Sequence, residues 1–360
     1  MKTYYLFAFI PTALALYLAS ANPILIFICS ALALIPLASL SQESTDSLAS
    51  DLGPTWGGLL SASLGNAPEI IIGVSALRHG LVNVVKSSLV GSILGNLLLA
   101  LGLSMFLGGL RNGTLQFNRR VAGMSSALLT LTAAGLIIPA VFHHTSRPFS
   151  REISLEIAVV LFLVYLGSLA YTLTTRQPAI GKPAVEAEVA GMAEPAQDEP
   201  QWSRRKALGV LAISTFVLAV MSEILTDALE PASRAMGLSA TFSGVFLLAL
   251  AGNVSETFGA VSFARARKMD LSFGVTVGAS IQVALVVAPV LVFCGAFLNR
   301  PMDLIFGRFE LVAVALAIVV TRPLIDDGQS TWLDGLMLIG VYVMLGIGFF
   351  NLPNALPVSF

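Results

Sequence analysis

The sequence predicts an all-α integral membrane protein with about eleven transmembrane helices. Ten of them would form a core of two inverted five-helix repeats, and the eleventh is an extra N-terminal helix. Two observations predict this class: a repeated motif and the composition, with 56% apolar and only 11% charged residues in 360. Soluble domains carry about a quarter charged residues. A soluble protein with a very large core would need more charge to cover its outside, so the membrane class is strongly favoured.

Eleven apolar stretches give the predicted spans, several of them near the roughly 20 residues that cross a hydrocarbon layer as a helix. They lie at about 4–19, 22–40, 54–78, 86–110, 121–142, 153–174, 207–229, 238–264, 272–298, 309–322 and 335–350. The first and tenth are short. The first follows a single lysine and also fits a cleaved signal peptide, but we expect a retained helix.

A change of composition between residues 175 and 206 predicts the domain division. We expect an extra helix over 1–21, a first repeat over 22–174, an acidic linker over 175–206 and a second repeat over 207–360. The linker is rich in Pro, Ala and acidic residues. Its prolines favour a solvated segment over a short amphipathic helix.

Loop charge predicts the orientation. The side that holds the N-terminus carries thirteen of the twenty Lys and Arg residues, and the opposite side seven. By the positive-inside rule, the N-terminus and the 175–206 linker are cytoplasmic. Together with the length and short loops, this favours the inner membrane of a bacterium.

Charge and cysteine content exclude several partners. A net charge of −1 provides no overall field for nucleic acid. Cys29 and Cys294 lie inside apolar runs, which predicts neither a disulfide framework nor a metal site. We expect the lipid bilayer and a transported cation as partners, and no cofactor.

An internal repeat defines the candidate site. The segment LGNAPEIIIGVSALRHGL (64–81) aligns without a gap with AGNVSETFGAVSFARARK (251–268), at an offset of 187 residues. Because each half has an odd number of spans, the halves have opposite orientations, which places a substrate site near the midplane. The matched residues are Gly65 with Gly252, Asn66 with Asn253, and Glu69 with Glu256.

The backbone near each motif is expected to be irregular. Gly65 and Pro68 weaken the first helix, and Gly252 weakens the second. Weakened helices would free carbonyl oxygens close to Glu69 and Glu256. The two glutamates then come from opposite sides of the pseudo-symmetry axis and can meet at the centre.

The carboxylates of Glu69 and Glu256 suggest binding of protons or metal ions. A carboxylate alone at the bilayer centre costs at least ~3 kcal/mol, so it persists if protonated, paired with a base or bound to a cation. No Lys or Arg lies inside the assigned spans near Glu69 or Glu256. Protons and metal ions remain, and their competition for one carboxylate pair is a mechanism for antiport.

The type of ligand narrows the choice of transported ion. The candidate side chains are oxygen donors, and none of these positions carries an imidazole or a thiolate. This favours Ca²⁺ over Mg²⁺, leaves Mn²⁺ open, and makes zinc and copper poor fits. Besides the glutamates and backbone carbonyls, the donors are Ser92, Asn96, Ser280 and Gln282, with Ser88 weaker. Helix packing explains the first four about equally well, but Asn96 and Gln282, which follow the two glutamates at nearly equal distances, are the better ligand candidates.

The paired motifs resemble those of the calcium/cation antiporter superfamily, within it the cation/proton exchanger (CAX-type) branch. They are GNAPE (65–69) with 76–96, and GNVSE (252–256) with 271–282; the resemblance spans about 22–350. It implies a ten-helix inverted-repeat core and movement of calcium against an inward flow of protons. It also implies central glutamates at Glu69 and Glu256, with carbonyl ligands from the Gly65–Asn66 and Gly252–Asn253 turns.

Several positions refine the resemblance. Gln282 stands where sodium-coupled relatives usually carry an acid, which favours protons over sodium. Val254, Ser255 and Thr257 depart from the usual second motif, and Ala279 stands where serine is common. These departures keep a manganese or broader cation exchanger open.

A second acidic position lies on the helix that opens the second half. Glu223 and Asp227 are four residues apart and share a helix face. The resemblance implies a role near the mouth of the ion path, with Glu223 as a proton-path residue. The alternative is that Asp227 and Glu230 simply lie at the membrane edge, in contact with water.

These observations favour a secondary antiporter that exchanges Ca²⁺ for H⁺ by alternating access. The helices around 22–40 and 207–229 are expected to slide to switch the opening. Sodium-coupled calcium exchange is the close rival, and a cation channel with the glutamates as its filter is less suited to buried, broken helices. An enzyme is not expected, because the sequence has no HExxH motif and no nucleophile–base constellation.

Overall fold

The computed structural model describes residues 3–145, 150–175 and 202–352, and most of them are helical. Eight helices in these ranges are long and apolar enough to cross a membrane, and a shorter apolar helix covers Tyr5–Leu18. Large apolar side chains such as Leu163, Val319 and Val343 point outward, as contact with lipid requires. The predicted all-α membrane class is confirmed.

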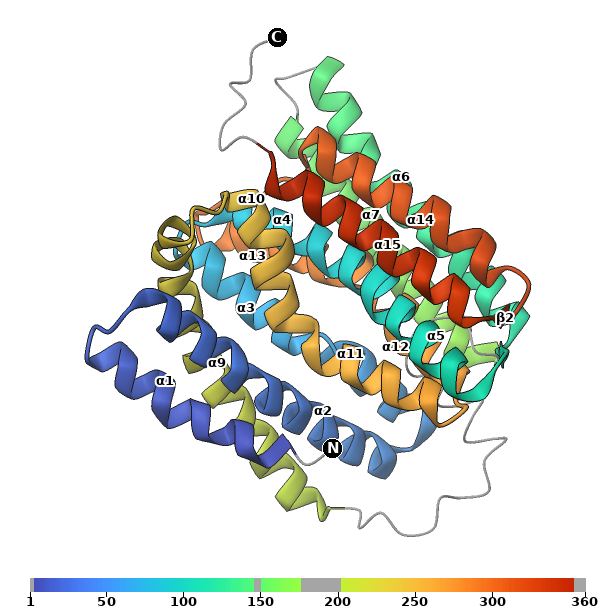
Figure 1. The fold of residues 1–360 in the computed structure, drawn as a ribbon, viewed down its shortest axis with the longest axis horizontal. Helices are drawn as coiled ribbons and strands as arrows, with labels where there is room; N and C mark the ends of the chain where they lie inside the picture. The colour runs from blue at the N-terminus through green and yellow to red at the C-terminus, as the bar shows by residue number, and fades with distance from the viewer. Residues whose placement is uncertain (1–2, 146–149, 176–201, 353–360) are drawn as a thin grey trace.

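The first half runs from a short 3₁₀-helix to α7, with one π-helix (Figure 1). Its elements are η1 (Thr3–Ala8), α1 (Phe9–Leu18), α2 (Pro23–Leu64), α3 (Ala67–Arg78), α4 (Val82–Leu94), the π-helix η2 (Gly95–Ala100), α5 (Leu101–Asn112), β1 (Leu115–Gln116), α6 (Arg119–Thr145) and α7 (Ser150–Thr175). The extra helix α1 packs against α2 and α9.

The second half begins after residues 176–201, where most of the predicted linker falls outside the described residues. Its elements are α9 (Arg204–Ala235), α10 (Ala240–Phe242), the π-helix η4 (Ser243–Leu248), α11 (Ala249–Arg265), α12 (Met269–Gln282), the π-helix η5 (Val283–Val287), α13 (Ala288–Phe297), α14 (Arg308–Ile325), β2 (Gln329–Ser330) and α15 (Trp332–Phe350). Most of the predicted spans in this half therefore start or end within a few residues of a helix terminus.

The long element α2 contains a reversal of the chain. A Cβ atom placed on Gly57 would lie 2.1 Å from the carbonyl oxygen of Ala49, whereas residues eight apart in a straight helix are separated by about 12 Å. The chain therefore turns back between Ala49 and Gly57. The predicted spans 22–40 and 54–78 lie on the two sides of this turn, but helical backbone replaces the loop expected between them.

The helices of the two halves match at the offset of the motifs. α3 ends at Arg78 and α11 at Arg265, while α4 begins at Val82 and α12 at Met269. α4 and α12 each run directly into a π-helix, η2 and η5, which the sequence did not predict. The repeat is thus visible in backbone irregularities as well as in residues.

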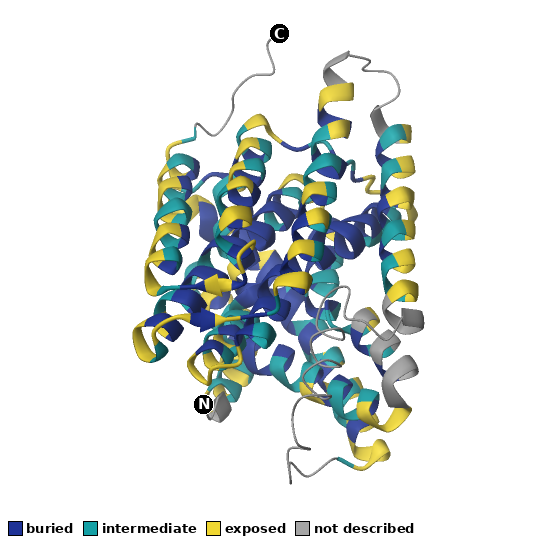
Figure 2. Cartoon of the chain, turned by 90° about the vertical axis from the view of Figure 1, so that its right-hand side faces the viewer, coloured by how far each residue is buried: buried dark blue, intermediate teal, exposed yellow. Residues whose placement is uncertain are grey.

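The helices that carry these π-helices form the centre of the molecule. In the most apolar 18-residue stretch of each span, 78% is buried in Val82–Asn112 and 83% in Met269–Phe297. The corresponding share in Trp332–Phe350 is 22%. Figure 2 shows this buried interior between outer helices whose faces are exposed. The motif helices α3 and α11 both pack against α4, so their polar residues are held near this interior.

A short antiparallel pair joins two connections at one end of the bundle. Leu115 and Gln116 of β1 lie opposite Ser330 and Gln329 of β2. Next to this pair, the backbone N–H of Phe117 donates to the carbonyl oxygen of Gly328 at 2.9 Å. The α5–α6 and α14–α15 connections are therefore tied together.

Candidate cation-binding site

The first motif breaks its helix as predicted. α2 ends at Leu64, and α3 begins at Ala67 with Asn66 as its N-cap residue. Pro68 has no N–H to donate to the carbonyl oxygen of Leu64, so the helical ladder cannot continue through the motif. Glu69 consequently lies in the first turn of α3, where the helix dipole favours a negative charge.

The second motif does not break its helix, which corrects the expectation for Gly252. α11 is continuous from Ala249 to Arg265, through Gly252 and Asn253. The physical reason is the residue at the position of Pro68: Ser255 supplies the N–H that proline lacks. The irregular segment lies one turn earlier instead, in the π-helix η4.

Glu69 faces the second repeat across a small cavity. A Cβ atom on Gly252 would lie 3.9 Å from Cγ of Glu69, so the glutamate faces α11 at Gly252. The cavity volume is about 20 Å³, and its lining includes Glu69, Ser88, Ser92 and Gly252. Glu69 is therefore separated from Gly252 by enough space for one methyl group.

Glu256 lies one helical turn after Gly252 and has a partner in the first repeat. The amide Nδ2 of Asn96 donates to Oε2 of Glu256 at 3.4 Å. Asn96 is fully buried in η2, and its Oδ1 has no hydrogen-bond partner within the described part of the chain. A buried amide oxygen without a partner is a suitable ligand for a hard cation.

The asparagines of the two motifs bond across the repeats. Nδ2 of Asn66 donates to Oε1 of Gln282 at 2.8 Å. In the reverse direction, Nδ2 of Asn253 is 3.4 Å from the carbonyl oxygen of Ser92, and Oγ of Ser92 is 3.5 Å from Oδ1 of Asn253. The structure therefore brings Asn66, Gln282, Ser92 and Asn253 together at the interface between the halves.

The structure treats the two predicted serines differently. Ser92 lines the cavity of Glu69 and contacts Asn253. Ser280 is buried, and its hydroxyl donates to the carbonyl oxygen of Thr276 in its own helix at 3.0 Å. Its contacts are those of a packing residue.

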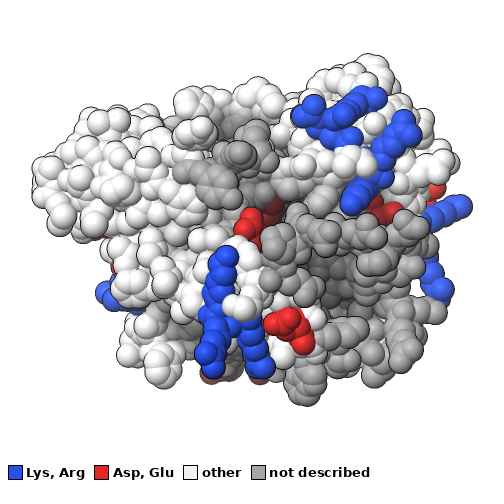
Figure 3. Space-filling view, turned by 90° about the horizontal axis from the view of Figure 1, so that it is seen from below, with Lys and Arg blue, Asp and Glu red and all other residues white. Residues whose placement is uncertain are grey.

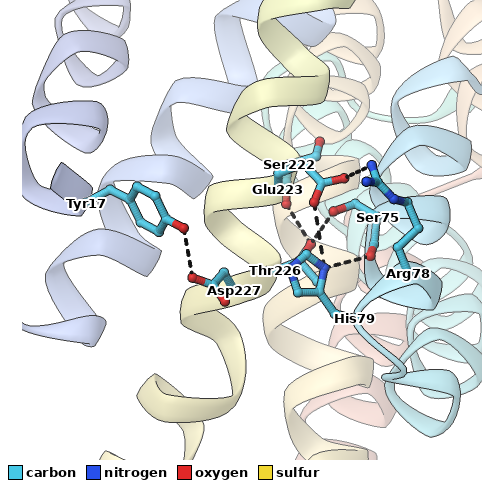
Figure 4. A network of polar contacts seen from close by, with 8 residues as sticks. All are labelled: Tyr17, Ser75, Arg78, His79, Ser222, Glu223, Thr226 and Asp227. Atoms are coloured by element: carbon cyan, nitrogen blue, oxygen red, sulfur yellow. Dashed lines mark hydrogen bonds and ion pairs between the residues drawn. The ribbon is translucent and has the colours of Figure 1, made fainter. Parts of the chain in front are cut away.

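Glu223 lies away from this cavity, at the far end of α3 (Figure 4). Nη1 of Arg78 is 2.7 Å from Oε1 of Glu223, and Nδ1 of His79 is 3.8 Å from its Oε2. Next to them, Oγ of Ser75 donates to Oγ1 of Thr226 at 3.2 Å. The predicted span 54–78 ends at Arg78, and nothing in the sequence connects Arg78 or His79 to Glu223.

Glu310 is a buried acid that sequence reasoning did not select. It accepts hydrogen bonds from the backbone N–H of Gly307, at 2.7 Å, and from the hydroxyl of Ser87. Three residues after Gly307, it caps the N-terminus of α14 in the manner of the glutamate of a capping box, but glycine has no side chain to complete the box. The Ser/Thr that marks this motif in a sequence is absent, so the sequence offers no signal for this role.

The donors available to a cation are mainly oxygens. No group of three or more His, Cys, Asp or Glu side chains that could hold a metal occurs within residues 3–145, 150–175 and 202–352. A cation bound between α3 and α11 would therefore combine few carboxylates with neutral amide, hydroxyl and carbonyl oxygens. Such a mixed oxygen set suits calcium better than zinc or copper.

Comparisons with known proteins agree on one family. A model of the sodium/calcium exchanger protein family matches residues 22–174 and 206–350. A protein of Aphanothece halophytica named Ca(2+)/H(+) antiporter is 38% identical over 357 residues, covering 97% of this chain and 96% of its own. Ca(2+)/H(+) antiporter ChaA of Bacillus subtilis is also 38% identical, over 321 residues that cover 89% and 90% of the two chains. The solved structure of native YfkE superposes with a TM-score of 0.83 at 33% identity, over 97% of this chain and 100% of its own.

Proposed function

Because the chain belongs to the sodium/calcium exchanger protein family, we propose that it is a secondary antiporter that exchanges Ca²⁺ for H⁺ across a membrane. The relatives that are 38% identical over most of both chains carry the name Ca(2+)/H(+) antiporter. The observation that carries the proposal is the position of Glu69, a carboxylate of the first repeat that faces the second-repeat motif at Gly252. That motif also contains the second carboxylate, Glu256.

In the proposed mechanism, Ca²⁺ and protons compete for Glu69 and Glu256. Bound calcium would neutralise both carboxylates, and protons would do the same after its release. Since a carboxylate is costly in the membrane interior when it carries an uncompensated charge, one occupant has to replace the other. Exchange by alternating access follows from this requirement.

The remaining ligands are proposed from the geometry around the glutamates. The break between Leu64 and Ala67 makes carbonyl oxygens near Gly65 and Asn66 suitable ligands. In the continuous helix α11, the carbonyl oxygen of Asn253 accepts the hydroxyl of Thr257 at 3.0 Å. We therefore assign the carbonyl contribution mainly to the first motif, and give Gly252 and Asn253 a role in spacing and cross-repeat bonding.

The surrounding polar residues are proposed to support this pair. Asn96 would orient Glu256 and offer its buried Oδ1. Gln282 would hold Asn66, and Ser92 would hold Asn253. Gln282 is a neutral residue, and its lack of charge favours protons over sodium as the coupling ion.

The orientation and location are also proposed. We place the protein in a bacterial inner membrane with the N-terminus and the 175–206 linker in the cytoplasm. Figure 3 shows that Lys and Arg side chains gather in groups on the face seen from below, the face near which Figure 1 places the N-terminus. Basic residues on this face agree with the positive-inside rule. The division into units 1–21, 22–174, 175–206 and 207–360 is part of this proposal.

The first test is radioactive calcium uptake into inverted vesicles under an imposed pH gradient, inside acid. Wild type would be compared with Glu69→Gln and Glu256→Gln, which keep the shape of each side chain and remove its charge. Glu156→Gln makes the same change at an exposed position of α7 and is the control. We expect uptake that collapses with the gradient, is lost in both site variants and remains in the control.

Other results would contradict the proposal in identifiable ways. Calcium uptake that needs a sodium gradient and ignores pH would show that the coupling ion is sodium. Uptake of Mn²⁺ without Ca²⁺ would show that the transported cation is different. Full activity in Glu69→Gln would show that the paired carboxylates are not the binding site.

A further inference from the structure

The end of α3 that is distant from Glu69 is joined to α9 by a group of side-chain contacts (Figure 4). Arg78 forms an ion pair with Glu223, and the ring of His79 approaches the second oxygen of the same carboxylate. One turn deeper, Ser75 and Thr226 share a hydrogen bond between hydroxyl groups. Both of these deeper residues are buried.

We propose that Ser75, Arg78, His79, Glu223 and Thr226 form a latch that holds α3 against α9 and opens in each exchange cycle. We call this group the α3–α9 latch. The inference rests on the proposed function, since it assigns these residues to a step of the same transport cycle. It assigns them no contact with the transported ion.

α3 connects the latch to the candidate cation site. Glu69 and Arg78 are nine residues apart in one helix, which corresponds to 2.5 turns and about 14 Å. They therefore point to opposite sides of α3, one toward the cavity and the other toward α9. Ala76 and Leu77 between them are fully buried, so movement at either end of α3 is transmitted through a packed helix.

The packing of α9 indicates which of its contacts can separate during the transport cycle. α9 contacts α2 extensively and α3 much less. If α2 and α9 slide together, as expected for the switch between openings, the contact between α9 and α3 has to be broken and remade. The α3–α9 latch lies on this contact.

The composition of the latch suits a contact that opens repeatedly. Side chains of Arg78 and Glu223 are 60% and 38% exposed, and exposed ion pairs contribute little to stability. Water can solvate both charges when the pair separates. By contrast, the buried Ser75–Thr226 contact consists of two neutral hydroxyls, which avoids leaving a buried charge unpaired on opening.

The decisive experiment locks the contact with a reversible disulfide. The variant Ser75→Cys/Thr226→Cys would be made in a Cys29→Ala/Cys294→Ala background, which removes both native thiols. The hydroxyl oxygens at these positions are 3.2 Å apart, close enough for a disulfide after small side-chain rotations. We expect oxidation to lower calcium exchange at least tenfold and reduction to restore it, with disulfide formation measured by thiol labelling.

A matched control links two connections that the latch does not involve. Gln116→Cys/Gln329→Cys joins residues that lie opposite each other in the β1–β2 pair. Because Phe117 and Gly328 next to them are hydrogen-bonded, this is a non-hydrogen-bonded position, where side chains lie closer together. Oxidation of the control should leave the exchange rate within twofold.

The outcomes separate the latch from the proposed function. An oxidised Ser75→Cys/Thr226→Cys protein that exchanges calcium at the reduced rate would overturn the latch, and so would failure of this pair to form a disulfide. If both reduced proteins and the cysteine-free background show no proton-coupled calcium exchange, the proposed function fails instead.

A charge exchange distinguishes the latch from a proton relay at Glu223. Arg78→Glu and Glu223→Arg each place like charges together, and we expect each to change the exchange rate at least fivefold. The double variant restores an ion pair with reversed polarity and should return the rate to within twofold of wild type. Arginine stays protonated and cannot relay a proton, so this rescue shows that the ion pair, and not a proton carried by residue 223, is required; a double variant no better than Glu223→Arg would overturn the latch.

Discussion

The two motif helices carry the same Gly-Asn-x-x-Glu pattern, but their backbones differ. In the first repeat the helix stops at Leu64 and restarts at Ala67, and in the second α11 continues from Ala249 to Arg265. The residue that separates the two cases is Pro68, whose counterpart is Ser255. Glycine and asparagine alone do not break a membrane helix, because every backbone N–H can still find its carbonyl partner; proline removes one donor.

Because of this difference, the two motif helices contribute different groups to the candidate site. The broken helix places Glu69 in the first turn of α3, close to the carbonyl oxygen of Leu64, whose helical donor would be the N–H that Pro68 lacks. The continuous helix instead offers Gly252, which Glu69 faces, and a Glu256 that bonds to Asn96. The two repeats are therefore similar in sequence and unequal as ligand sources.

The largest expected effect comes from making the second helix like the first. Ser255→Pro removes the hydrogen bond to Ala251 inside α11 and introduces a steric clash, at a cost of about 3 kcal/mol or more. We expect a lower Tm in detergent and a loss of calcium exchange of more than tenfold. Ser255→Ala, which keeps the N–H, is the control and should exchange calcium normally; equal stability of both variants would show that the continuity of α11 is unimportant.

The reverse change should affect binding more than folding. Pro68→Ser restores an N–H at the second position of α3, where proline is well tolerated, so stability should change little. The helix can then continue through the motif and withdraw carbonyl oxygens from the cation. We expect the KM for calcium to rise about tenfold, an effect of roughly 1.4 kcal/mol; an unchanged KM would show that these carbonyls do not bind the ion.

The paired glycines should respond unequally to alanine. A Cβ atom at Gly65 would lie 2.7 Å from the carbonyl oxygen of Ser61, whereas one at Gly252 would meet no atom closer than 3.9 Å. Gly65→Ala should therefore lower stability by about 1–3 kcal/mol through overpacking, and Gly252→Ala should leave it nearly unchanged. Thermal unfolding of the two purified variants measures the two losses of stability. If Gly252→Ala were the less stable variant, the packing around the two glycines would be contradicted.

The paired asparagines give a smaller contrast. Asn66 bonds to Gln282 at 2.8 Å, while the contacts of Asn253 with Ser92 are 3.4 and 3.5 Å long. Asn66→Ala leaves a buried amide oxygen unsatisfied, at a cost of about 1–3 kcal/mol, and Asn253→Ala should cost less. Unfolding of Asn66→Ala, Gln282→Ala and the double variant would reveal the coupling, and additive losses would show that the two side chains do not interact.

The smallest expected effect concerns the serines of the central helices. Ser92→Ala removes a hydroxyl that lines the cavity of Glu69 and should raise the KM for calcium by a few-fold. Ser280→Ala removes a hydroxyl that bonds only to its own helix among the described contacts, and should change the KM by less than twofold. Radioactive calcium uptake at varied calcium concentration compares the two, and a larger effect at Ser280 would reassign the ligand role.

Much of the architecture could be predicted from the sequence. Composition established the membrane class, and the offset of 187 residues identified the repeat, whose helix ends match at Arg78 and Arg265. Pro68 was sufficient to predict the break before Glu69. These features are local or periodic, so they are encoded in residues that are adjacent in the chain.

The partners of the polar side chains could not be predicted in this way. Glu223 was assigned to the ion path by resemblance; the structure shows that it pairs with Arg78 of another helix and lies near His79. Ser280 and Ser92 occupy nearby positions in the two repeats, yet only Ser92 lines the cavity. The sequence shows which residues are polar but does not show how the helices cross.

The sequence by itself therefore determined that this protein spans a membrane, that it is built from a repeat, and that one motif helix is interrupted. Only the tertiary structure decided that α4 and α12 run into π-helices, that α2 turns back between Ala49 and Gly57, and that Asn66 meets Gln282. Hydrophobic periodicity and proline act along the chain, within a few residues. Contacts between helices depend on their rotation and crossing, and each π-helix shifts that rotation by an extra residue per turn.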